Sequence, residues 1–325
     1  MNEEELLKRA RQLPATIEPS RDLWPGIAAR LGRPSARPSV RLWLALAASV
    51  VVLVGGWLAM RPSGAGWRVA TLAGRPTVGA RRIESRGRLR VGQELVTDGA
   101  SRARLAVGTI GAVEVEPNTR LRLLATTATD QRLALDRGTI SAQVDAPPRI
   151  FFVETPAGVA ADLGCAYTLT VDSAGHGVIH VTAGYVEFAG VGRRSIVSLG
   201  SWAETRPGVG PGTPYVGDAP AALREALARF DFAAGGSPAA TAALAAARPE
   251  DATSLWHLLQ RVDEGLRVRV YERLVQFAPL PAGVTRAAVL RLDAAALAAW
   301  WNPIRRAAWR REILKDVRPS ARPVP

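Results

Sequence analysis

Cysteine and histidine are scarce in this 325-residue chain, which has one cysteine, Cys165, and three histidines. A single cysteine cannot form an internal disulfide, so packing alone must stabilise the folded parts. His176 and His180 are four residues apart, but we expect them on a turn and a strand, which does not bring two side chains together as metal ligands. We therefore expect no metal and no other cofactor.

Lysine is nearly absent as well, with only Lys8 and Lys315, so the net charge of +13 comes almost entirely from arginine. These arginines are spread along the chain rather than gathered in one run, which is typical of a solvated surface. The composition therefore does not favour a direct nucleic-acid partner. It also shows no clustered Ser/His/Asp set, paired carboxylates or metal-ligand pattern, so an enzyme is not expected.

The longest stretch without a charged residue covers residues 42–60, LWLALAASVVVLVGGWLAM. As a helix it would extend roughly 28 Å, close to the hydrocarbon thickness of a bilayer. Trp43 and Trp57 lie near its ends, where indole rings prefer the headgroup level. A cleaved signal peptide would need a short basic leader, and a buried core helix would show polar positions on one face. We therefore predict a transmembrane helix over residues 40–61.

Arginines set the expected orientation of this helix. Four arginines precede it within about 12 residues, and fewer follow it over the same distance; the four are Arg30, Arg33, Arg37 and Arg41. The N-terminus is therefore expected in the cytoplasm, with the larger C-terminal part on the extracytoplasmic side of the membrane.

Residues 1–39 form the predicted cytoplasmic arm. Two short amphipathic helices are expected, followed by a Pro/Ser/Arg linker at residues 32–39. Their apolar faces are too small to cover one another, so the membrane surface or a groove on a partner protein must cover them, unless the arm is a disordered tail with a helical tendency. The residues expected to bind a partner are Leu13, Leu23, Trp24, Ile27 and Leu31.

From residue 62 to 206 the pattern changes to short strands in which apolar and polar residues alternate, separated by turns rich in Gly, Asp and Pro. Each strand can bury only one face, so we expect an all-β domain that is either a two-layer sandwich or a short β-solenoid. The expected buried faces include Ala103, Leu105, Val107, Val113, Val115, Leu121, Leu123, Leu133, Leu135, Ile140, Ala142 and Val144.

The stretch RIFFVETPAGVAADLGCAYTLTVDSAGHGVIHVTAGYVEFAG resembles the core signature of the FecR family, and the similarity extends over roughly residues 67–205. Two positions differ from the usual pattern, Cys165 for threonine and Tyr167 for phenylalanine. Both changes keep a small residue and an aromatic one, so the resemblance implies the same fold, with Cys165 as a small buried residue rather than a reactive thiol. The residues expected to be structural are Thr155, Pro156, Gly158, Gly164, Tyr167, Gly184 and Val186.

Beyond the β domain, residues 207–218 are rich in Gly and Pro and are expected to be a linker. Residues 219–317 show helical periodicity and predict a small bundle of about five or six helices, and residues 318–325 are expected to be a disordered tail. We expect four aromatic residues, Trp256, Tyr271, Trp300 and Trp301, in the core of the bundle, although the last two could dock on the β domain or a partner. The whole chain is then a membrane-anchored α+β multidomain protein.

The resemblance implies a function. Members of the FecR family act as anti-sigma factors or sigma regulators, whose cytoplasmic segment holds an extracytoplasmic-function sigma factor while the outer domain senses an envelope protein or ligand. The arm lacks the His-x3-Cys-x2-Cys pattern of zinc-binding anti-sigma proteins, so inhibition would need no zinc. Two alternatives stay open: an envelope module that uses the helix only as an anchor, and an envelope enzyme.

Overall fold

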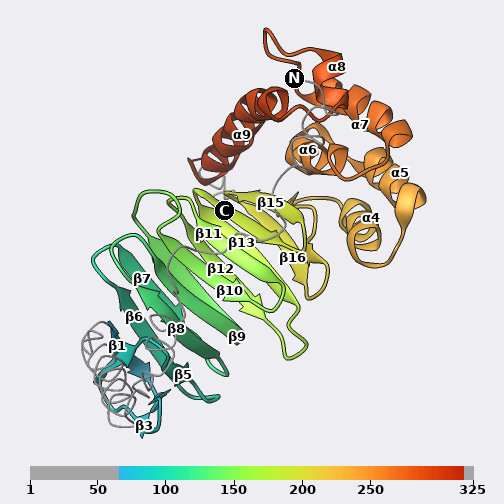
Figure 1. Cartoon of the computed structure of the whole chain (residues 1–325). Helices are drawn as coiled ribbons and strands as arrows, with labels where there is room; N and C mark the ends of the chain where they lie inside the picture. Colours follow the sequence, from blue (N-terminus) through green and yellow to red (C-terminus); the bar gives the residue numbers. More distant parts are fainter. Residues whose placement is uncertain (1–65, 318–325) are drawn as a thin grey trace, which may run out of the picture. The chain divides into compact units, whose positions relative to one another are not determined.

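The computed structural model describes residues 66–317. The predicted arm, the predicted transmembrane helix and the predicted tail at residues 318–325 lie outside the described residues. Within the described part, no helix is long and apolar enough to cross a membrane. The described residues belong to one compact unit. Figure 1 shows its strands following one another from β1 to β16, with the helices next to the last strands.

The β region consists of two sheets that enclose one apolar core. Sheet A contains, in spatial order, β4 (Arg86–Arg90), β1 (Gly66–Ala73), β6 (Arg102–Val107), β7 (Gly111–Val115), part of β9 (Gln131–Val144), β12 (Ala166–Val171), β13 (Gly177–Ala183) and β16 (Ser201–Arg206), with β17 (Gly210–Pro211) and β18 (Tyr215–Val216) on the edge of β16. Sheet B contains β3 (Arg81–Arg82), β2 (Thr77–Val78), β5 (Glu94–Val96), β8 (Arg120–Thr126), the rest of β9, β10 (Phe151–Thr155), β11 (Gly158–Asp162), β14 (Tyr185–Gly190) and β15 (Arg193–Ser198).

These pairings decide between the two expected β architectures. Among the described strands, every pair is antiparallel except β9 with β10, whereas the coils of a solenoid stack as parallel strands. The domain is therefore a two-layer sandwich. The predicted alternation is also confirmed, because all the side chains expected to face the core are at most 4% exposed.

The two sheets are joined by β9, a continuous strand of 14 residues. Residues 131–137 pair in sheet B, and residues 138–144 pair in sheet A. Gly138 lies where the pairing changes from one sheet to the other and makes a bend inside this strand. Its φ of +99° and its contact with Thr119, which leaves no room for a Cβ, explain why glycine is needed there.

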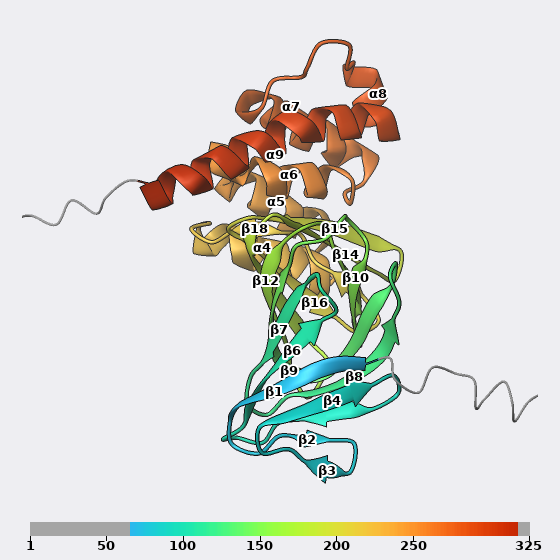
Figure 2. The same ribbon diagram turned by 90° about the vertical axis from the view of Figure 1, so that its left-hand side faces the viewer.

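Six α-helices follow the sandwich in the described chain (Figure 2), and they bury a second apolar cluster. They are α4 (Ala221–Phe232), α5 (Gly236–Ala246), α6 (Ala252–Leu259), α7 (Glu264–Phe277), α8 (Arg286–Leu290) and α9 (Ala294–Val317), with a 3₁₀ turn, η1 (Pro249–Asp251), before α6. The four aromatic residues expected in this core are all buried, which confirms the prediction. Trp300 packs against Tyr271, and Trp301 against Trp256, with ring centroids 5.7 and 4.6 Å apart.

Residues 207–218, expected to be a linker, hold the short strands β17 and β18, and residues 210–214 are all buried. The Gly and Pro residues that suggested a flexible connection instead permit close packing, since a side chain at Gly212 would collide with Phe232 of α4. This segment therefore lies within the contact between the sandwich and the helices.

Candidate functional site

The FecR-like signature residues lie in the segment from β10 to β14, either in turns or on strand positions that face the core of the sandwich. The Thr155 hydroxyl donates to the carbonyl of Gly158 (3.0 Å) and accepts from the amide of Ala157 (3.2 Å), which closes the β10–β11 turn around Pro156. Gly158 has a φ of +143° and lies against the carbonyl of Ala189 with no room for a Cβ. The Thr-Pro-x-Gly sequence therefore makes one tight turn.

The structure brings a second group of these residues together. Gly164 and Gly184 both have positive φ, and a Cβ on Gly184 would collide with the Gly164 carbonyl oxygen. Tyr167 and Val186 are buried nearby in the sandwich core. The Tyr167 hydroxyl has no hydrogen-bond partner among the described residues.

Cys165 lies between these glycines and donates its thiol proton to Asp162 Oδ2 across 2.6 Å. The Asp162 carboxylate also accepts from the amide of Gly164 (2.7 Å). Burial raises the pKa of Asp162, and burial together with the neighbouring carboxylate raises the pKa of the Cys165 thiol. A thiol with a raised pKa and almost no exposure is a poor nucleophile, so the structural role expected for Cys165 agrees with its surroundings.

His176 and His180 do not contact each other. His176 is exposed and lies 3.4 Å from the carboxylate of Asp172, whereas His180 stacks on Trp202 with ring centroids 4.0 Å apart. Over residues 66–317 no group of three or more His, Cys, Asp or Glu side chains could hold a metal ion.

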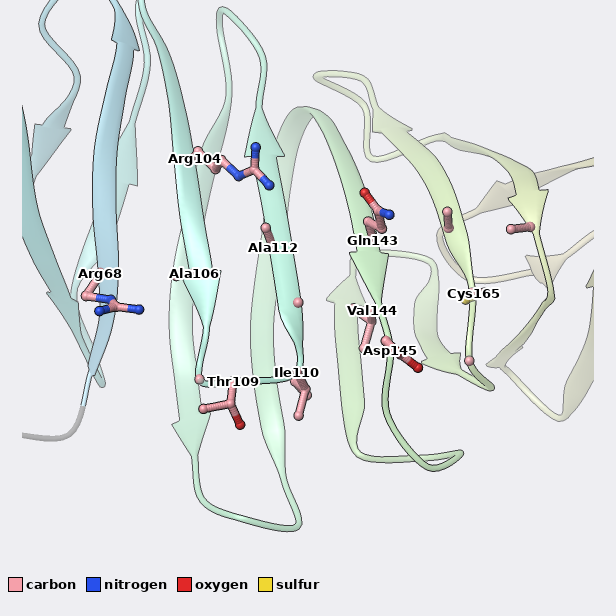
Figure 3. A pocket seen from close by; sticks show the side chains of 15 residues that line it. Arg68, Arg104, Ala106, Thr109, Ile110, Ala112, Gln143, Val144, Asp145 and Cys165 are labelled. Atoms are coloured by element: carbon pink, nitrogen blue, oxygen red, sulfur yellow. The ribbon is translucent and has the colours of Figure 1, made fainter.

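A hollow with a volume of about 920 Å³ lies on the outer face of sheet A, beside Cys165 (Figure 3). Small residues at aligned positions of β6, β7, β12 and β13 form its floor; they include Ala106, Ala112, Ala166 and Ala183. Arg68 and Arg104 stand at one side and Asp145 at the other, so the hollow carries charges of both signs.

A polar joint connects the sandwich to the helices, and the sequence reasoning did not find it. The Asp231 carboxylate of α4 accepts from Arg261 (3.0 Å) and from the amide of Thr213 (2.6 Å), and Arg193 of β15 lies 3.4 Å away. Arg261, which follows α6, also donates to the hydroxyl of Ser195 in β15 (2.7 Å). Asp231 and Arg261 have side chains that are 1% and 11% exposed, so this is a buried ion pair.

His257 of α6 completes the joint. Its Nε2 accepts from the amide of Ile196 in β15 (3.0 Å), and its Nδ1 lies 2.8 Å from the carbonyl of Thr253. Burial, with further contributions from Arg261 and Arg194, lowers the pKa of His257 to about 3, so the ring is neutral at physiological pH. The histidine thus occupies the outer edge of β15, which would otherwise offer a free amide to another strand.

Residues 93–187, from the loop before β5 into β14, match the family model described as FecR protein. The chain therefore carries a FecR domain. This confirms the resemblance drawn from the signature residues, and the matched range includes the β10–β11 turn, Cys165 and the hollow's floor.

Two crystal structures of a "putative anti-sigma factor" from Parabacteroides distasonis, at 1.65 and 2.50 Å resolution, are also similar to the chain. Each is 15% identical with a TM-score of 0.32, and the match covers 36% of this chain. The chain spans 56% of the length of those proteins. A search of curated proteins finds no match. The assignment of the FecR domain therefore rests on the family model.

Proposed function

We propose that this chain is a single-pass membrane anti-sigma factor of the bacterial inner membrane. In this proposal, residues 40–61 cross the bilayer, the N-terminal arm is cytoplasmic, and the FecR domain with its helices lies on the outer side. The single observation that carries the proposal is the FecR domain at residues 93–187. In the sequence this domain follows the apolar run 42–60 and the N-terminal arm, for which apolar helix faces are predicted.

In the proposed mechanism, the N-terminal arm binds the partner and the outer part of the chain receives the signal. The apolar residues of the arm, Leu13, Leu23, Trp24, Ile27 and Leu31, insert into a groove of an extracytoplasmic-function sigma factor and keep it from core RNA polymerase. An envelope protein or ligand that acts on the outer part then releases the arm. This role is regulatory rather than enzymatic.

The joint supports a shared role for the sandwich and the helices. Asp231, Arg261 and His257 connect α4, α6 and the edge of β15 through buried hydrogen bonds. The second half of α9 adds an exposed contact, in which Lys315 lies 3.0 Å from Asp218. A ligand that binds either part therefore acts on a single folded body.

The test is co-purification of the full-length chain from its native membrane, with the bound proteins identified by mass spectrometry. We expect one sigma factor to co-purify with the wild-type chain and to be strongly reduced with Trp24→Ala. Trp309→Ala is the matched control, because Trp309 is an exposed tryptophan of α9. If no sigma factor is recovered from either chain, the proposal fails, and an envelope module without a sigma partner becomes the better description.

A further inference from the structure

Six arginines gather on the outward face at the β4 end of sheet A, which we call the arginine face. Strand alternation turns Leu89, Val69 and Leu105 into the core and the arginines between them outward. The six residues are Arg86, Arg88 and Arg90 of β4, Arg68 of β1, and Arg102 and Arg104 of β6.

The register places these like charges close together. Arg68 is directly opposite Arg88 across β1 and β4, and Ala70 lies between Arg86 and Arg104 on neighbouring strands. Directly opposed like charges destabilise a sheet. A bound negative charge would therefore reduce the repulsion between these arginines and stabilise this part of sheet A.

Acidic side chains neutralise only part of this charge. Glu116 lies 2.7 Å from Arg102, and Glu114 lies 3.6 Å from Arg104. Arg68, Arg86 and Arg90 make no ion pair with any described residue. Six arginines against two glutamates leave a net charge of +4 on the outward positions of β4, β1, β6 and the β7 end.

The hollow extends this face into a concave surface. Arg68 and Arg104 belong to both, and the small side chains of the floor leave about 920 Å³ of open volume next to the two guanidinium groups (Figure 3). A guanidinium group binds phosphate oxygens in a bidentate manner. The guanidinium groups of the surface thus suit a phosphate group that is presented from outside.

The position of the arginine face in the chain indicates the source of the phosphate group that it binds. Gly66, the first residue of β1, pairs with Arg90, so the chain enters the sandwich at this face. Only residues 62–65 separate β1 from the end of the proposed transmembrane helix, a reach of about 18 Å at most. This step rests on the proposed function, because it takes residues 40–61 as the span.

We propose that the arginine face docks the FecR domain onto the anionic phospholipid headgroups of the membrane that anchors the chain. Docking holds the sandwich against the bilayer with the hollow over a lipid phosphate. Each arginine near an anionic surface strengthens such docking by about fivefold.

The test reconstitutes the full-length chain in nanodiscs of phosphatidylcholine, with or without phosphatidylglycerol. A fluorophore on Thr109→Cys, in a Cys165→Ala background, reports proximity to nitroxide-labelled headgroups, since Thr109 is exposed at the edge of the hollow. We expect strong quenching only with phosphatidylglycerol, and its loss at an ionic strength of about 1 M, where the Debye length falls to about 3 Å.

Two triple variants distinguish an effect of the arginine face from a general effect of positive charge. R68Q/R86Q/R90Q should lower the docking equilibrium on the order of a hundredfold. The control, R81Q/R82Q/R137Q, removes three exposed arginines from sheet B strands and should leave the quenching unchanged.

The outcomes that contradict the inference differ from those that contradict the proposed function. Equal quenching in the two lipids, or equal loss in the two triple variants, overturns the docking proposal while the sigma-binding role stands. A chain that does not insert into nanodiscs overturns the proposed span, and the docking proposal with it.

Discussion

Asp231→Ala should destabilise the protein far more than the loss of an ordinary surface ion pair. Its carboxylate is the only acidic group in the joint that contacts Arg261, and it also accepts the amide proton of Thr213. The variant leaves the Arg261 guanidinium, with a side chain only 11% exposed, without its counter-ion. The contact with Arg193, whose side chain is 35% exposed, adds little.

The expected loss follows from this burial. Removing one partner of a buried ion pair costs about 3–5 kcal/mol, because the remaining charge stays desolvated. An exposed pair contributes at most about 1 kcal/mol. Glu116→Ala is therefore a suitable control, since its pair with Arg102 has a similar distance, 2.7 Å, but side chains that are 43% and 29% exposed.

The assay is denaturant unfolding of the full-length chain in detergent, followed by tryptophan fluorescence. We expect Asp231→Ala to lower the free energy of unfolding by about 3–5 kcal/mol and Glu116→Ala by no more than about 1 kcal/mol. Asp231→Ala combined with Arg261→Met should recover part of the loss, because the unpaired charge is then gone. Equal losses in the two single variants would refute the description of the joint as a buried ion pair.

Three further predictions concern single positions. The pKa of His257 is about 3 in the folded protein and about 6.5 when unfolded, so the unfolded state binds a proton that the folded state does not. Stability should therefore fall by about 2 kcal/mol from pH 7 to pH 5 through this group, and denaturant unfolding of His257→Gln should show that much less pH dependence. Gly184→Ala should lower the melting temperature clearly more than Gly192→Ala; both have positive φ, but only Gly184 faces a backbone oxygen, and Gly192 has open space. Cys165 should react with maleimide only after unfolding; fast labelling of the native chain would contradict its burial beside Asp162.

Local periodicity was enough to predict most of the sandwich. Residues such as Leu105, Leu121 and Leu133 are buried as expected, because a half-exposed strand must alternate with a period of two. The signature glycines were recognisable for a similar reason, since Gly158 and Gly184 occupy backbone positions that other residues fill only with strain.

Long-range contacts could not be predicted in the same way. Nothing local distinguishes Asp231 or Arg261 from the many solvated charges, and their burial depends on how α4 and α6 meet β15. Gly138 reads as a turn in isolation, but it bends one strand between two sheets. The arginine face had a visible local signal, the alternation RGRLR of β4, but only the register shows that Arg68 joins it.

The most direct test of the central proposal is a competition between the full-length chain and core RNA polymerase for the purified sigma factor. The account predicts that the wild-type chain prevents the sigma factor from binding the core enzyme, and that Trp24→Ala largely loses this effect while Trp309→Ala keeps it. If the sigma factor binds the core enzyme equally well with and without the wild-type chain, the anti-sigma function is contradicted.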